Sequence, residues 1–264
     1  MCTVSFLPRE HGYLLGMNRD EKIARGAGYP PEVRQLQGKR AAFPSDKAGG
    51  TWIACNEYGI SLALLNWNVP VMQPSPQLSR GLIIPHLLSS MNPSELNSAL
   101  ATYAFVHCAP FRLLAVIPDE RRVLQWSWDG THLAERSCSW EMRHWFSSSA
   151  SDSRAQELRG HVCSRASNDR KTGSVAWLRQ IHQSHENGPG AFSMCVHREL
   201  VETLSYTEIS CTQDRVSMVH AIGKPCDPRE TRIIELWRVR SSISIAIPSL
   251  MDSQPSEQSD VCRS

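Results

Sequence analysis

The tightest limit on how this chain folds comes from a short and nearly continuous apolar run, residues 60–65 (ISLALL). A strand with apolar residues on both faces is typical of a sheet that is covered on both sides. Residues 52–55 (WIAC) form a second apolar segment, and the connector 56–59 (NEYG) predicts a hairpin between the two. We therefore expect a layered domain with a covered sheet inside it.

Further strands are predicted towards both ends of the chain. Residues 3–7 and 13–17 are short and apolar and are separated by a turn, which predicts an N-terminal hairpin. Other strands are predicted at residues 111–117, 122–128, 204–211, 215–220 and 232–239. Residues 23–50 carry glycines, prolines and scattered charges without a period, so we predict a long loop there.

Helical patterns lie between these blocks of strands. Asn92, Pro93 and Glu95 provide a capping side chain, a proline for the first helical position and a glutamate three residues after the cap. This predicts a helix that continues to about residue 106, and others are predicted at 81–90, 147–165 and 175–183. Strands that enclose helices predict one α+β layered domain over residues 1–252. The polar residues 253–264 predict a disordered tail.

Charge and cysteine content exclude several classes of protein. The 28 basic and 26 acidic residues nearly balance, which disfavours a nucleic-acid partner. No stretch reaches the roughly 18 apolar residues of a membrane-spanning helix, and the first residues lack the pattern of a secretory signal. The nine cysteines are odd in number and include no C-x-x-C pair, which favours a reducing compartment, the cytoplasm, over a disulfide framework.

Cys2 is the cysteine whose position carries chemistry. Removal of Met1 is expected because the next side chain is small, and Cys2 would then hold a thiol and a free α-amino group. The amine titrates near pH 8 and the thiol near 8.5, so the amine can act as the base for its own nucleophile. The alternative is an ordinary cysteine at the start of an edge strand.

Two further segments place polar side chains at predicted strand ends. Arg19 and Asp20 follow the second strand and would point to opposite faces if that strand continues. The aspartate could orient an N-terminal amine, and the arginine could lower a thiol pKa, although a solvated charge cluster is the simpler alternative. Asn66 ends the apolar run and could donate to an oxyanion or merely cap the following turn.

Other residues carry weaker signals. His182 and His185 lie in a polar helix with no third ligand in register, so we expect no zinc site and no cofactor there. Trp126, Trp128 and Trp140 are predicted to be core or strand-face aromatics rather than a base-stacking platform. The partner that remains is a small-molecule substrate or ligand; the sequence does not indicate an oligomeric state.

Taken together, several motifs resemble one known family. They are MCTVSF at the start, NRDE at 18–21, GGTW at 49–52, NEYGISLALLN at 56–66 and SRG at 79–81. In this order they resemble the Transport and Golgi organisation protein 2 (NRDE) family. That family is similar in turn to choloylglycine hydrolases and penicillin acylases, which implies a four-layer αββα sandwich of the N-terminal-nucleophile type.

The resemblance also implies roles for individual residues. Cys2 matches the nucleophile, Asp20 matches the aspartate that contacts the amine, and Asn66 resembles the side chain of the oxyanion hole. Ligand contacts are expected from four residues of the motifs and their neighbourhood: Asn18, Arg19, Arg80 and Ser148. Two departures are that Met17 stands where the hydrolases carry an arginine, and that Ser148 stands near their second active-site asparagine. Arg198 is the candidate for their late arginine.

Two functions follow from these expectations. The first is a cysteine hydrolase that cleaves a linear non-peptide amide, with Cys2 as nucleophile. The alternative is a non-catalytic protein that binds or carries haem or an acyl lipid in the same cleft, which the eukaryotic members of the family suggest. Cys2 favours the hydrolase, and the missing asparagine near Ser148 favours the carrier.

Overall fold

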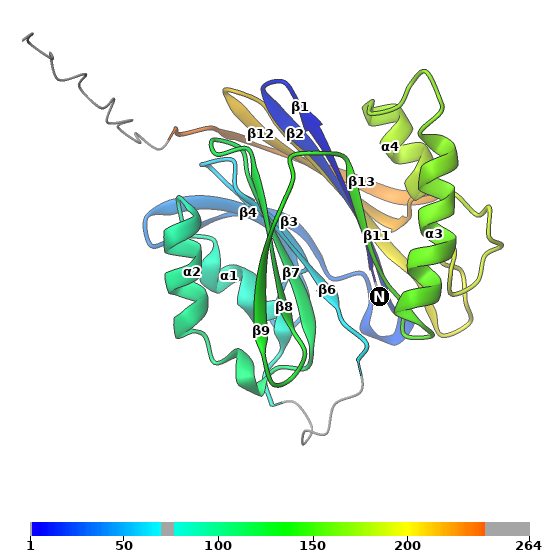
Figure 1. The fold of residues 1–264 in the computed structure, drawn as a ribbon, viewed down its shortest axis with the longest axis horizontal. Coiled ribbons are helices and arrows are strands. Elements are labelled where there is room, and N and C mark those ends of the chain that lie inside the picture. Colours follow the sequence, from blue (N-terminus) through cyan, green and yellow to red (C-terminus); the bar gives the residue numbers. More distant parts are fainter. Residues whose placement is uncertain (1, 70–76, 241–264) are drawn as a thin grey trace, which may run out of the picture.

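The computed structural model describes residues 2–69 and 77–240 of the 264-residue chain. Within these residues, two antiparallel sheets pack face to face, and helices cover the outer side of each sheet (Figure 1). The six-stranded sheet has the order β10 (Arg143–Ser147), β1 (Cys2–Arg9), β2 (Gly12–Lys22), β11 (Val201–Cys211), β12 (Arg215–Lys224) and β13 (Asp227–Trp237). The architecture is the predicted α+β four-layer αββα sandwich.

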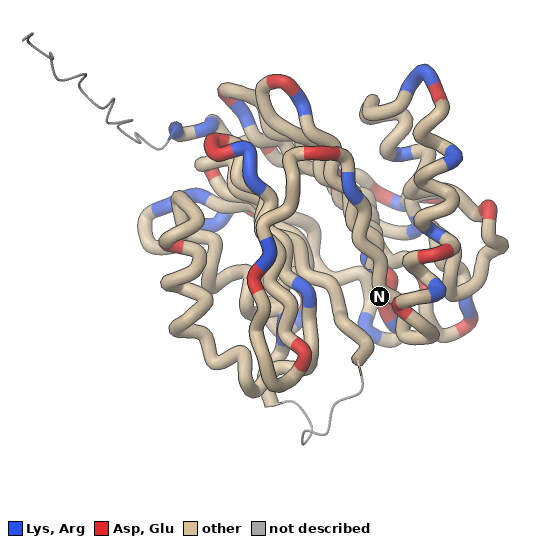
Figure 2. The backbone as a smooth tube through the Cα atoms, viewed as in Figure 1, with Lys and Arg blue, Asp and Glu red and all other residues tan. Residues whose placement is uncertain are grey.

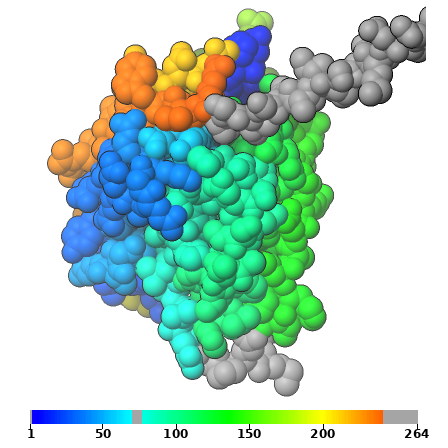
Figure 3. Space-filling view, turned by 90° about the vertical axis from the view of Figure 1, so that its left-hand side faces the viewer, coloured from blue at the N-terminus to red at the C-terminus, as the bar shows by residue number. Residues whose placement is uncertain are grey.

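The second sheet and the helices complete the layers. The seven-stranded sheet has the order β3 (Tyr29–Leu36), β4 (Lys39–Ser45), β5 (Ile53–Asn56), β6 (Ser61–Asn66), β7 (Phe111–Ile117), β8 (Arg122–Trp128) and β9 (Leu133–Cys138). Its outer face packs on α1 (Ile83–Leu87) and α2 (Pro93–Thr102), whereas α3 (Asp152–Ala166) and α4 (Val175–His182) cover the six-stranded sheet. At one side of the sandwich, β13 lies against β3 and β4 (Figure 3).

The apolar run that predicted a covered sheet is strand β6. Leu62 and Leu64 pack towards α1 and α2, whereas Ala63 and Leu65 face the six-stranded sheet. All four side chains are buried because successive residues of a strand point to opposite faces and both faces are covered here. The prediction that this run forms a strand of a sheet covered on both sides is therefore confirmed.

The N-terminal hairpin is also confirmed and is longer than predicted. Strands β1 and β2 pair from Cys2 opposite Arg19 to Arg9 opposite Gly12. The predicted helix start at Asn92 is confirmed too, because its side chain accepts a hydrogen bond from the Glu95 backbone N–H at 3.0 Å. That helix ends at Thr102 rather than near residue 106, and a short 3-10 turn, η3 (Phe105–His107), follows.

The predicted long loop at residues 23–50 is wrong. It contains the hairpin of β3 and β4, whose turn residues Gln37 and Gly38 have φ angles of 51° and 79°. Consecutive positive φ angles are typical of tight hairpin turns. The strand was hidden in the sequence because β3 is an edge strand with an exposed and polar outer side. The short edge strands β9 and β10 were missed as well.

Charge is distributed without a one-sided basic field over the part of the chain that is described (Figure 2). Within residues 2–69 and 77–240, none of the helices combines the length and apolar character needed to cross a membrane. The predicted disordered tail, residues 253–264, lies outside the described residues.

Candidate active site

Cys2 begins β1, a strand inside the six-stranded sheet, between β10 and β2. It pairs with Arg19 on one side and with Ser147 on the other, and its side chain is buried. The Cys2 backbone nitrogen donates a hydrogen bond to the Ser147 hydroxyl at 2.9 Å. The sheet thus fixes both the thiol-bearing carbon and the nitrogen of residue 2.

Arg19 and Asp20 lie on opposite sides of β2, as the strand pattern predicted. Arg19 faces the seven-stranded sheet, where its guanidinium carbon lies 4.2 Å from the centre of the Trp52 ring. Its Nη1 donates to the Gly26 carbonyl at 3.1 Å. This cation is therefore held in place by a ring face and a carbonyl beside Cys2.

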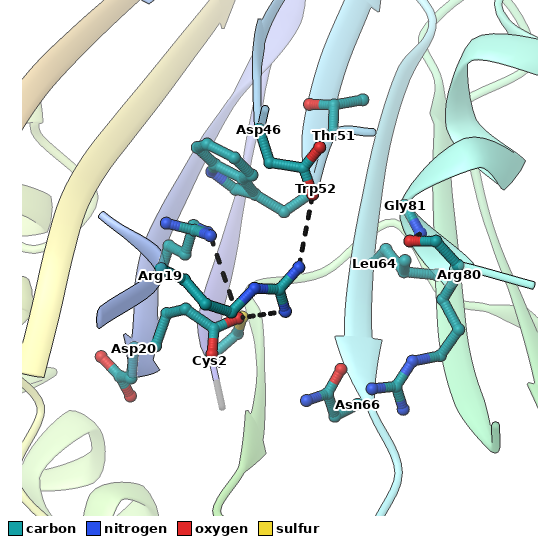
Figure 4. Close-up of a pocket in the computed structure, with 13 residues that line it drawn as sticks. Cys2, Arg19, Asp20, Asp46, Thr51, Trp52, Leu64, Asn66, Arg80 and Gly81 are labelled. Atoms are coloured by element: carbon teal, nitrogen blue, oxygen red, sulfur yellow. Dashed lines mark hydrogen bonds and ion pairs between the residues drawn. The ribbon is translucent and has the colours of Figure 1, made fainter. Parts of the chain in front are cut away.

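A pocket of about 100 Å³ opens between the two sheets at this point. The six-stranded sheet contributes Cys2, Arg19 and Asp20, and the seven-stranded sheet contributes Asn66 at the end of β6 (Figure 4). Arg80, in the short helix η2 (Arg80–Leu82), lies beside Asn66 and donates to the Pro110 carbonyl at 2.7 Å. The pocket is lined by Cys2, Arg19, Asp20, Glu21, Arg25, Asp46, Thr51, Trp52, Leu64, Asn66, Ser79, Arg80 and Gly81.

A buried ion pair supports β1 and β2 from the helix side. Asp20 Oδ2 lies 3.2 Å from Arg159 Nη2, and neither side chain is exposed to solvent. The Thr203 hydroxyl donates to the other Asp20 oxygen at 2.6 Å. Arg159 also donates to the Thr3 hydroxyl at 2.7 Å and to the Cys2 carbonyl at 3.4 Å. The helix α3 is thereby tied to the residue that carries the thiol.

Sequence reasoning missed Arg159, although a signal was present. Ala155, Val162 and Cys163 lie three or four positions away on α3 and are all buried against the sheet. An arginine in the middle of such an apolar stripe must find a buried acceptor, because a lone buried charge is very costly.

The environment of the thiol keeps it protonated. Burial raises the pKa of the Cys2 thiol above its ordinary value, Asp20 adds to the rise, and Arg19 opposes it. A thiol of this kind is a poor nucleophile at neutral pH until a neighbouring base takes its proton. The nitrogen of Cys2 is a peptide nitrogen while Met1 is attached, and it would become a basic α-amino group only on removal of Met1.

Two residues that were predicted to contact a ligand do not line the pocket. Asn18 faces the helix layer, and its amide nitrogen donates to the carbonyls of His182 and Met194 at 2.9 and 2.7 Å. The backbone N–H of Ser148 donates to Asp152 at 2.7 Å, and its hydroxyl donates to the Ala191 carbonyl at 3.3 Å. These polar groups are engaged in holding the helix layer and its loop.

Three other positions lie beside the predicted site residues or were compared with the hydrolase pattern. Ser147, one residue before Ser148, provides the hydroxyl at Cys2. Met17 is fully buried among apolar side chains between the two sheets. Arg198, the candidate for the late arginine, does not line the pocket; its backbone N–H donates to the Val201 carbonyl at the start of β11.

The three tryptophans lie in or against the core, as predicted, and the two histidines lie in different parts of the structure. Trp126 and Trp128 are buried under α2 and its flanking segment, and Trp140 packs against the core between the sheets. His182 is buried and its Nε2 lies 2.9 Å from the Ser5 hydroxyl. His185 belongs to a different cluster, so the two histidines do not share a site.

Comparisons with known proteins agree with this architecture. The sequence profile described as Transport and Golgi organisation 2 matches residues 1–159. The fold is similar to that of penicillin V acylase from Agrobacterium tumefaciens, with a TM-score of 0.53, 11% identity, and coverage of 89% of this chain and 86% of that chain. A variant of conjugated bile acid hydrolase from Clostridium perfringens gives a TM-score of 0.50, 12% identity, and coverage of 89% and 92%. A sequence search of the curated proteins finds no match.

Proposed function

Because this chain belongs to the Transport and Golgi organisation 2 family and folds as an αββα sandwich, we propose that it is a cysteine amidohydrolase that cleaves a linear, non-peptide amide bond. One observation carries the proposal. Cys2 opens an interior strand and lines a pocket with the side-chain amide of Asn66, while the carboxylate of Asp20 lies on the other face of the adjacent strand β2. Since a thiol nucleophile works only while it is reduced, we place the reaction in the cytoplasm.

The first chemical step begins after Met1 has been removed. The α-amino group of Cys2 takes the thiol proton, and the sulfur attacks the amide carbonyl carbon. The C–N bond then breaks, the leaving amine takes the proton back from the α-ammonium group, and an acyl thioester remains on Cys2. In the second step water attacks the thioester with the same amine as base, which releases a carboxylic acid and restores the thiol.

The surrounding residues have distinct roles in this proposal. The Ser147 hydroxyl, which accepts from the Cys2 nitrogen, orients the lone pair of the amine towards the thiol. Asp20 favours the ammonium form through its negative charge. Asn66 donates from its amide to the oxygen that becomes negative in the transition state. All of these groups are held by strands, which limits their motion before the reaction.

The position of Arg80 supports a substrate with an anionic group. Arg19 and Arg25 lie within ion-pair distance of Glu21, and Arg25 also approaches Asp46. Arg80 has no carboxylate partner among residues 2–69 and 77–240, and it lies in the wall opposite Cys2. A carboxylate or sulfonate on the substrate would complete the coordination of this guanidinium.

Penicillin V and a conjugated bile acid are suitable first probes, since proteins of similar fold carry those names. We expect the protein with Cys2 at its N-terminus to release the amine from at least one linear amide of this kind. Cys2→Ala removes the sulfur and keeps the α-amino group, so it abolishes turnover. Cys138→Ala changes another buried cysteine between the sheets and serves as the matched control. Equal turnover by the wild type and Cys2→Ala would exclude Cys2 as the nucleophile.

A non-catalytic carrier of haem or an acyl lipid is the second candidate. It is favoured by Met17 and Ser148, which depart from the hydrolase pattern at two positions. The lining of the pocket opposes it, because its residues are largely charged and polar and offer little apolar surface to a porphyrin or a long acyl chain. Binding of haem or acyl-CoA below about 10 μM, roughly −7 kcal/mol, without turnover of any amide would favour the carrier.

A further inference from the structure

Four potential metal ligands converge on one place far from Cys2 in sequence. His185 follows α4, Cys195 and His197 lie in the loop before β11, and Cys226 forms the turn between β12 and β13. Their four ligand atoms all lie within 4.8 Å of one another. Three separate segments of the fold are thus brought together by side chains that bind soft and borderline metals.

The three distances among Cys195, His197 and Cys226 match those of a tetrahedral zinc centre, and the distance between the two imidazole nitrogens is somewhat shorter. Bond lengths of about 2.3 Å to sulfur and about 2.0 Å to nitrogen imply separations of about 3.8 Å between two sulfurs, 3.5 Å between sulfur and nitrogen, and 3.3 Å between two nitrogens. The two sulfurs of Cys195 and Cys226 are 3.7 Å apart. His197 Nε2 lies 3.4 Å from each sulfur and 2.9 Å from His185 Nε2.

Two simpler explanations account for less of this arrangement. A disulfide would require the sulfurs to approach to about 2.05 Å, and both cysteines are free thiols at 3.7 Å. A hydrogen bond between the two imidazoles would explain the 2.9 Å contact alone. It leaves unexplained why both thiols point at the same nitrogen of His197. One central cation explains all of these contacts.

We propose that His185, Cys195, His197 and Cys226 bind one Zn²⁺ ion as a structural Cys₂His₂ site. Four protein ligands fill a tetrahedral coordination sphere, so no position remains for a substrate or an activated water. Two thiolates balance the charge of the ion. The site is independent of the proposed hydrolysis and would be present in a carrier as well.

The contacts around the site indicate which parts of the fold the metal would hold together. Val196 follows the ligand Cys195, and its N–H donates to the Thr203 hydroxyl at 2.8 Å. That hydroxyl in turn donates to Asp20 at 2.6 Å. Met194, on the other side of Cys195, accepts from Asn18. Zinc therefore fastens the loop before β11 to the β12–β13 turn and supports the helix side of β2.

Metal analysis of the purified protein tests the site directly. We expect protein prepared with a reductant and without chelators to contain about one zinc ion per chain. Cobalt, added to chelator-stripped protein, should give a thiolate charge-transfer band and the intense visible bands of tetrahedral coordination. His185→Ala and Cys226→Ser change exposed ligands, so both variants should stay folded and lose the zinc. His132→Ala removes another exposed histidine and should keep the full metal content.

The opposite results overturn the proposal. One is wild-type protein that stays folded after chelation and takes up no zinc on dialysis against the metal. Another is full zinc content in both ligand variants. A third is a Cys195–Cys226 disulfide in reduced cell extract, shown by alkylation before and after reduction. In the expected case, zinc raises the melting temperature of the wild type and of His132→Ala but not of Cys226→Ser.

Discussion

Arg19 and Asp20 are consecutive residues, yet they serve two different sides of β2. The Arg19 side is the pocket, where the cation stacks on Trp52 beside the thiol of Cys2. The Asp20 side is closed by the helix layer, where the carboxylate is bound by Arg159 and Thr203 without solvent. Strand β2 thus presents Arg19 to the pocket on one face and Asp20 to the helix layer on the other. Variants on the two sides should have separable effects on turnover and on stability.

The pocket side is tested most severely by blocking the α-amino group. A fusion with a cleavable N-terminal tag keeps the nitrogen of Cys2 in a peptide bond, and cleavage exposes the amine. We expect the uncut fusion to turn over amides at least about 10⁴-fold more slowly than the cleaved protein, because the thiol then lacks its base. The rate of amine release from the substrate measures turnover by both forms.

Both forms should unfold at the same urea concentration, since the tag changes no contact of the sandwich. An uncut fusion that is as active as the cleaved protein would remove the amine from the mechanism.

The supporting side should respond mainly in stability. Arg159→Met leaves Asp20 buried without its counter-ion, which costs about 3–5 kcal/mol of unfolding free energy. Urea unfolding of the variant measures the loss. Arg154→Met, on the same helix, breaks an exposed pair with Glu157 and should cost less than about 1 kcal/mol.

The double variant with Asp20→Asn and Arg159→Met should recover part of the loss, because the uncompensated charge is gone. Equal costs for Arg159→Met and Arg154→Met would show that the buried pair does not support β2.

The opposite wall of the pocket should respond in turnover alone. Asn66→Ala removes the amide that would bind the oxyanion, so we expect kcat to fall about 10²–10³-fold with KM little changed. Asn68→Ala is the matched control, since Asn68 donates to Asp152 outside the pocket. Steady-state kinetics of both variants distinguish an oxyanion contact from a turn cap, for which kcat would be unchanged.

Acid should weaken both sides through buried histidines. Burial lowers the pKa of His182, behind β1, to about 3, and burial with a smaller effect of Arg19 lowers that of His220 to about 4. The unfolded chain takes up these protons below about pH 6.5, whereas the folded chain does so only near pH 3–4. Stability should therefore be constant above pH 6.5 and fall as the pH drops from 6.5 to 4, by up to about 3 kcal/mol for each histidine.

Unfolding free energies of the wild type and His220→Gln between pH 7 and 4 measure this dependence. The variant should show a shallower decline, and identical slopes would contradict the assignment of His220.

The smallest effect concerns Arg80, a pocket cation without a carboxylate partner within residues 2–69 and 77–240. Arg80→Gln should raise KM for an amide with a carboxylate about tenfold, or about 1.4 kcal/mol, and leave a neutral amide of the same size unchanged. Arg25→Gln, whose side chain already lies beside Glu21 and Asp46, should change neither. Steady-state kinetics of both variants with the two substrates measure these KM values. If Arg80→Gln changed KM equally for the carboxylate amide and the neutral amide, Arg80 would not bind an anionic group of the substrate.

Much of the fold could be predicted because local patterns and tertiary packing agree. The run in β6, the cap at Asn92 and the N-terminal hairpin all follow from residues close in sequence. The hairpin of β3 and β4 could not be found in this way, because its edge strand β3 is largely exposed and polar and shows no apolar alternation.

The site residues could be predicted where the ends of their strands could be located in the sequence. Cys2, Arg19 and Asn66 follow from position and from motif, and they line one pocket. Arg159 comes from a helix more than 100 positions away, and only packing brings it to Asp20. The cluster around Cys195 depends in the same way on three loops whose meeting no local pattern reveals.

Mass spectrometry of an acid-quenched reaction tests the central claim most directly. Protein with a free N-terminus is mixed with a slowly hydrolysed amide, stopped at low pH and digested for peptide mapping. The account predicts a first peptide that begins with Cys2 and gains the mass of the acyl group as a thioester. Hydrolysis of the amide with no acyl group on that peptide, or with Met1 still attached to fully active protein, would contradict it.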